Sequence, residues 1–128
     1  MNEIQQSGLM YATIMLVAGI GIPIMAALNA GLGIRLQSPG TASSILFLVG
    51  LLGSLTYLFT VEEALPSVSK FNVPIYFYLG GIFVLFYVLS IAWVAPSFGV
   101  GNAIAFVLLG QLIAMATIDQ FGFLGAPQ

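Results

Sequence analysis

Apolar residues run along this chain in long stretches that charged side chains barely interrupt. The charge-free segments are residues 4–34, 36–61 and 71–118. A helix needs about 20 apolar residues to cross a hydrocarbon core of roughly 30 Å. The first two segments can therefore each hold one span, and the third is long enough for two.

The third segment contains a helix-breaking signal near its middle, Ala95-Pro96-Ser97-Phe98-Gly99. Proline lacks a backbone donor and disfavours helix in the residue before it, which predicts a turn there. A transmembrane β-barrel is not expected, because its strands would alternate apolar and polar residues. The sequence thus predicts an all-α membrane bundle that forms a single domain, residues 1–128. The expected transmembrane helices are residues 9–34, 42–61, 74–95 and 99–118.

Composition supports the membrane assignment and narrows the chemistry. Only 5% of the residues are charged and 60% are hydrophobic, whereas a soluble domain has about a quarter of its residues charged. Without cysteine or histidine, disulfides, thiol catalysis and the usual transition-metal ligands are excluded. With only two basic residues, the chain cannot form the basic surface patch that binds nucleic acid. With no nucleophile–base pair or phosphate-binding loop, we expect neither an enzyme nor a bound cofactor or metal.

The two basic residues favour opposite orientations of the chain in the membrane. Lys and Arg favour the cytoplasmic side of a membrane when they lie in short loops. With four spans, Arg35 falls in the first loop and Lys70 in the second, on opposite membrane faces. One interpretation is that other features or a partner decide the orientation. The other is dual topology, in which copies insert both ways and pair antiparallel.

Uncharged polar side chains within the predicted spans are few, and three amides are candidates for a substrate path: Asn29, Asn102 and Gln111. An amide in hydrocarbon needs a hydrogen-bond partner, so we expect Asn29 and Gln111 to face the bundle interior. They could contact a substrate there. Alternatively, they could only join helices to one another, a use worth about 0.6–2 kcal/mol each.

Asp119, at the end of the last predicted span, is the one acidic residue that adjoins the charge-free third segment at its C-terminal side. An ionisable residue beside a span is a candidate for a coupling role, because it can bind and release a proton. The alternative is that Asp119 lies at the interface, where it stays solvated or caps backbone donors.

Several segments resemble the YdcZ-type family, small bacterial membrane proteins of the drug/metabolite transporter superfamily. Residues 26–33 resemble that family's A-A-x-N-A-x-L-G, and residues 95–99 its x-P-x-L-G. Residues 78–81 are similar to the end of its W-x-W-L-G-G. The most specific resemblance is that of residues 110–114 and 118–125 to the family's G-Q-L-x-x-S-L-x-I-D-H-F-G-L-L-G. Gln120 stands in place of the histidine that the family usually has. The likeness covers about residues 10–125.

The chain also departs from the family pattern. Met25 stands where family members usually carry a glutamine, so a polar contact implied by the family is in doubt there. The family generally has a fifth helix, whereas this chain ends after residues 125–128, as a shortened or a natural four-helix form. Four helices would resemble small multidrug resistance proteins, but the buried glutamate of their first helix has no counterpart here.

The resemblance implies a half-transporter of the bacterial inner membrane, multi-pass, working by alternating access on an unidentified small molecule. Such halves are thought to occur as dual-topology proteins, as paired subunits or as fused antiparallel halves. The expected partners are therefore the lipid bilayer and either a second copy in an antiparallel homodimer or a homologous subunit. The alternative is a non-transporting subunit that packs against a larger membrane protein.

Overall fold

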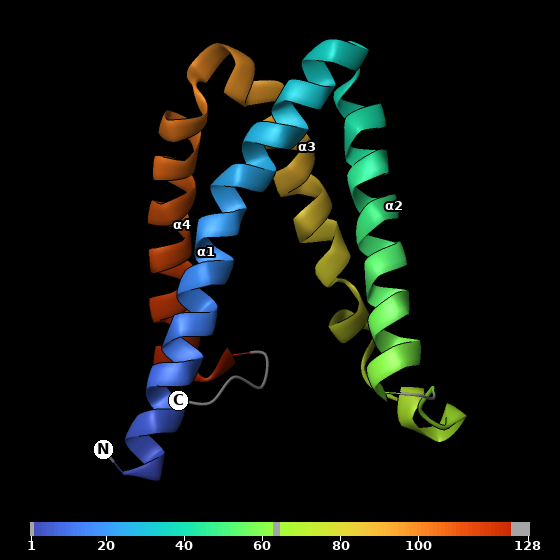
Figure 1. The fold of residues 1–128 in the computed structure, drawn as a ribbon, viewed down its shortest axis with the longest axis vertical. Coiled ribbons are helices and arrows are strands. Elements are labelled where there is room, and N and C mark those ends of the chain that lie inside the picture. Colours follow the sequence, from blue (N-terminus) through green and yellow to red (C-terminus); the bar gives the residue numbers. More distant parts are fainter. Residues whose placement is uncertain (1, 63–64, 124–128) are drawn as a thin grey trace.

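The computed structural model describes residues 2–62 and 65–123, which form four long helices joined by short connections (Figure 1). Each is long and apolar enough to cross a membrane, alone or with the short helical turn that continues it. The predicted all-α membrane bundle is confirmed. The helices are α1 (Glu3–Leu36), α2 (Pro39–Tyr57), α3 (Gly80–Phe98) and α4 (Val100–Phe121). A π-helical turn (Leu58–Glu62) extends α2, and two 3-10 turns (Val68–Phe71 and Ile75–Tyr78) precede α3.

Local sequence signals set where the first two helices begin. The Asn2 side chain accepts a hydrogen bond from the Gln5 backbone N–H at 2.8 Å, and the Gln5 side chain accepts one from the Asn2 N–H at 3.2 Å. This capping box starts α1 earlier than the hydrophobic pattern predicts. At α2, the Ser38 hydroxyl accepts from the Thr41 N–H and Pro39 occupies the first turn. Polar caps therefore lengthen both helices beyond their apolar runs.

The chain reverses within the predicted turn at residues 95–99, but α3 ends three residues later than the predicted residue 95, at Phe98. Pro96 is inside the last turn of α3, where its missing N–H removes only one hydrogen bond, and the helix continues to Phe98. The chain reverses at Gly99, whose φ of 92° and ψ of 138° suit glycine and almost no other residue. The Gly99 N–H still donates to the Ala95 carbonyl at 2.9 Å. The positive φ of Gly99, and not the proline, ends the helix.

Replacing Gly99 by alanine is expected to destabilise the protein by about 1–3 kcal/mol, because a Cβ is strained at this backbone conformation. Gly101→Ala is the matched control: Gly101 lies in α4, and a Cβ there would meet no atom within 4 Å. It should leave stability unchanged or raise it by about 0.5–1 kcal/mol. Thermal unfolding in detergent, followed by helical circular dichroism, measures both. Equal melting temperatures for the two variants would contradict this account of the turn.

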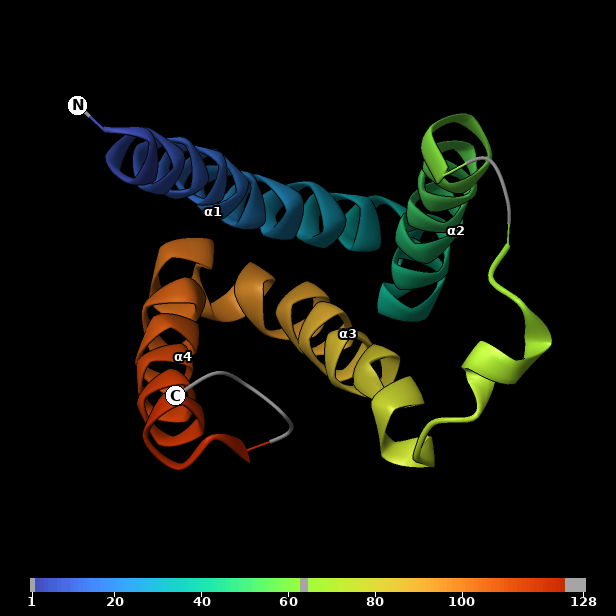
Figure 2. The ribbon, with the colours of Figure 1, turned by 90° about the horizontal axis from the view of Figure 1, so that it is seen from below.

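The four helices pack at one end of the bundle and diverge toward the other, like an inverted V (Figure 1). We call the end with the α1–α2 and α3–α4 connections the closed end, and the opposite end, with the N-terminus and the α2–α3 connection, the open end. Seen along the bundle, α1 and α3 lie between α2 and α4, and the described parts of α2 and α4 do not contact each other (Figure 2).

Small residues make the close packing at the closed end. The buried apolar residues are mostly alanines, from all four helices. A Cβ on Gly33 of α1 would lie 3.6 Å from Pro39 Cα and 3.8 Å from Ala42 Cβ, so α1 and α2 approach closely there. Small residues at such crossings let backbones come together, which is how membrane helices gain packing energy.

Toward the open end, most apolar side chains of the described residues are exposed. The accessible surface is 9938 Å², whereas a compact protein of 13.5 kDa exposes roughly 6,500 Å² by the usual scaling. Many large apolar side chains of all four helices are more than half exposed. In a bilayer these faces contact lipid or a second chain.

Candidate substrate path

Asn29 is the predicted path residue that the fold buries. It lies on α1 among the small residues of the closed half and is only 3% exposed. Its Nδ2 donates a hydrogen bond to the Val88 carbonyl of α3 at 3.3 Å. Its Oδ1 is buried and accepts no hydrogen bond from any described residue. Half of the amide thus joins two helices, and the other half has an unused acceptor.

A cavity of about 320 Å³ adjoins Asn29 between α1 and α2. Its other lining residues are apolar: Met25, Leu28, Leu32, Ile45, Leu46 and Val49. Met25, the position where the resemblance leads us to expect a glutamine, lines the same cavity as Asn29.

Asn102 lies at the turn between α3 and α4, and its side chain is exposed. Its Nδ2 donates to the Phe98 carbonyl at 2.8 Å, within the same turn. The bond satisfies a backbone acceptor at the end of α3, which has no partner inside its own helix. Asn102 thus closes the turn and does not contribute to the cavity beside Asn29.

Gln111 is exposed on α4, which differs from the expectation that it faces the interior. Its side chain makes no hydrogen bond within residues 2–62 and 65–123. Because α4 contacts only α1 and α3, much of its surface faces away from the bundle. A single chain therefore does not bring Asn29, Asn102 and Gln111 together in one cavity.

Four of the five charged residues that the structure describes lie at the open end. Glu3, Glu62 and Asp119 lie at helix ends there, and Lys70 lies in the α2–α3 connection; the fifth, Arg35, is at the closed end (Figure 1). No ion pair joins charged residues in the described part of the chain. Asp119 is exposed in the last turn of α4, where the helix dipole disfavours a carboxylate. The two bases lie at opposite ends of the bundle.

Two further buried hydroxyls were not singled out by the sequence. Ser43 of α2 is 2% exposed and Tyr87 of α3 is half-buried, and neither hydroxyl has a hydrogen-bond partner among the described residues. Tyr87 follows the apolar run at residues 82–86, where a tyrosine is easily read as one more apolar residue. The signal that could have revealed it is the hydroxyl itself, deep in a span.

The family described as "Putative inner membrane exporter, YdcZ" matches residues 10–128. Exporters are a transport class and not an enzyme class, and the four membrane-spanning helices agree with a multi-pass protein of the inner membrane. No curated protein and no solved structure gives a significant match to the chain.

Proposed function

This chain belongs to the YdcZ family, and on that premise we propose that it is half of a small-molecule transporter in which two chains associate antiparallel. Such a pair holds a substrate near the bilayer midplane and exposes it to each side in turn, as its two inverted halves exchange conformations. The second chain is another copy or a homologous subunit.

The observation that carries this proposal is the unused acceptor of Asn29. A buried carbonyl oxygen without a partner costs about 1–3 kcal/mol, and hydrocarbon cannot supply a donor. Helix packing alone uses only the Nδ2 side of the amide. A substrate with an N–H or O–H group that reaches Asn29 from the neighbouring cavity gives the oxygen its missing bond.

The need for a second chain is supported by the open V. The excess exposed surface, about 3,400 Å² over the compact expectation, is larger than the 1,200–2,000 Å² that a standard interface buries. An antiparallel arrangement also places one Arg35 and one Lys70 at each membrane surface. Gln111, exposed on α4 of a single chain, faces the partner in this arrangement and can complete the path.

Flux measurements on proteoliposomes test the proposal with a panel of small cations, anions and neutral metabolites. At least one compound should be transported, and Gln111→Leu should slow its transport about tenfold, the effect of one lost buried hydrogen bond. Gln6→Leu, at an exposed amide near the start of α1, is the matched control and should transport normally. If Gln111→Leu matches wild type for every transported compound, Gln111 is not on the path.

A non-transporting subunit gives a different result in the same assay. Neither wild type nor variants would move any compound above empty liposomes, and the protein would co-purify with a larger membrane protein in fixed ratio. In that case the amides serve only to join helices.

A further inference from the structure

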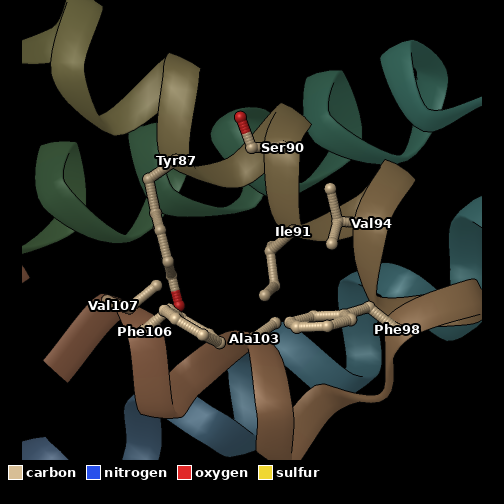
Figure 3. Close-up of a pocket in the computed structure, with 8 residues that line it drawn as sticks. All are labelled: Tyr87, Ser90, Ile91, Val94, Phe98, Ala103, Phe106 and Val107. Carbon is tan, nitrogen blue, oxygen red and sulfur yellow. The ribbon is translucent and has the colours of Figure 1, made fainter. Parts of the chain in front are cut away.

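A cavity of about 400 Å³ lies between α3 and α4. Its walls are apolar apart from Tyr87 and Ser90, and three aromatic rings border it: Tyr87, Phe98 and Phe106 (Figure 3). An apolar cavity of roughly 150 Å³ holds one benzene molecule. This cavity therefore has room for two fused rings with a substituent.

Tyr87 crosses the cavity from α3 to α4, and its hydroxyl ends beside Phe106 and Val107 (Figure 3). The hydroxyl is buried and has no hydrogen-bond partner in the described parts of the chain. A phenylalanine would fill the same space without that cost. Turning the Tyr87 hydroxyl toward a bound ligand breaks no existing hydrogen bond. A ligand with a polar group can therefore form a hydrogen bond to this hydroxyl without first replacing another one. Ser90 does not compete for this role, because its hydroxyl points away from α4.

The residues that line the cavity indicate whether its ligand is charged or neutral. No charged side chain lines the cavity, so nothing in its walls balances an ion. Aromatic rings attract cations, but an unpaired charge in hydrocarbon costs more than one such contact returns. The ligand that fits is neutral.

The cavity is open toward the lipid. Phe106 is 66% exposed and Phe98 is 44% exposed, and these two rings lie 5.9 Å apart at its border. A molecule dissolved in the bilayer can reach the space between them without crossing a polar surface. Lipid acyl chains can enter by the same route, but they offer no polar group to Tyr87.

We propose that the α3–α4 cavity binds a neutral, lipid-soluble aromatic molecule of about two fused rings, oriented by one hydrogen bond to the Tyr87 hydroxyl. This site is distinct from the cavity beside Asn29. The inference concerns a binding equilibrium, so it stands or fails independently of the transport proposed above.

The test uses 2-naphthol as the probe and naphthalene, which lacks the hydroxyl, as its partner. Trp93 is the one tryptophan of the chain and lies six residues after Tyr87, a rise of about 9 Å along α3. Quenching of its emission by either probe, with the full chain in detergent micelles, reports binding near the cavity. Saturable quenching separates binding from the linear background of probe dissolved in the micelle.

We expect wild type to bind 2-naphthol about five- to tenfold more tightly than naphthalene, the preference given by one hydrogen bond. Tyr87→Phe should remove that preference and leave naphthalene binding unchanged. Val107→Phe, which puts a ring into the cavity, should abolish saturable binding of both probes. Leu109→Phe, on α4 but not in the cavity wall, is its matched control and should bind both as wild type does.

Three results in detergent would overturn the proposal: quenching that never saturates, an unchanged preference for 2-naphthol in Tyr87→Phe, or normal binding by Val107→Phe. Tyr87→Phe preserves the shape of the side chain, so its comparison decides the matter even if Val107→Phe does not fold. The same titration in nanodiscs identifies the competing occupant. If 2-naphthol binding disappears as phospholipid replaces detergent, acyl chains fill the cavity and the proposal is wrong.

Discussion

Asn29→Leu is expected to reduce transport about five- to one-hundredfold while leaving the protein at least nearly as stable as wild type. The substitution removes both the acceptor offered to a substrate and the Nδ2 bond to the Val88 carbonyl. Loss of that bond costs about 0.5–1.5 kcal/mol, but loss of the unpaired Oδ1 returns about 1–3 kcal/mol. The expected fall in transport corresponds to 1–3 kcal/mol of lost substrate interaction.

The combination of the two measurements separates the path from simple helix joining. Initial rates in proteoliposomes give transport, and thermal unfolding in the same lipid gives stability. If Asn29 only joins α1 to α3, a variant that is nearly as stable as wild type also transports normally once reconstituted. That pair of outcomes would remove Asn29 from the proposed path.

Removing either basic residue is expected to bias the orientation of a chain that otherwise inserts both ways equally. One base near the membrane surface is worth about 1 kcal/mol, which changes an even distribution to roughly five to one. Arg35→Gln leaves Lys70 as the one base, so the open end and both termini should face the cytoplasm. Lys70→Gln leaves Arg35, so the closed end should face the cytoplasm instead.

Reporters fused to the C-terminus measure this distribution: green fluorescent protein emits only inside the cell, and alkaline phosphatase is active only outside the cytoplasm. The double variant Arg35→Gln/Lys70→Gln is the control and should return to a mixed orientation. If transport requires an antiparallel pair, each single variant should transport more slowly, because its minor orientation limits the number of pairs, and co-expression of the two variants should restore transport. A wild-type C-terminus found on one side only would rule out dual topology for this chain alone.

The fold was largely predictable, because each span depends on a property of its own segment. Long charge-free runs predicted four helices, and four spanning segments are found. The errors lie at the ends, where single hydrogen bonds and dihedral angles decide. Asn2 and Ser38 extend helices that hydropathy would begin later, and Gly99 ends α3 where Pro96 was expected to.

The candidate site was predictable only in part, because residue type does not say which way a side chain faces. Asn29 and Gln111 are both amides within apolar helices, yet one is buried and the other exposed. The difference comes from the helices around them: α1 contacts all three others, whereas α4 contacts two. Tyr87 was missed because the sequence does not show whether a tyrosine hydroxyl finds a hydrogen-bond partner. Only the fold reveals that this one is buried without a partner among the described residues.

The sequence by itself determined that this chain crosses a membrane and how many times. It also determined that one basic residue lies in each of two loops on opposite membrane faces. These properties depend only on hydropathy and charge along the chain. Its motifs also indicated the family. Only the tertiary structure decided which polar groups are buried without partners, where the cavities lie, and that one half of the bundle is open. Those properties depend on how helix surfaces meet, and alanines and glycines far apart in the sequence control where the helices come together.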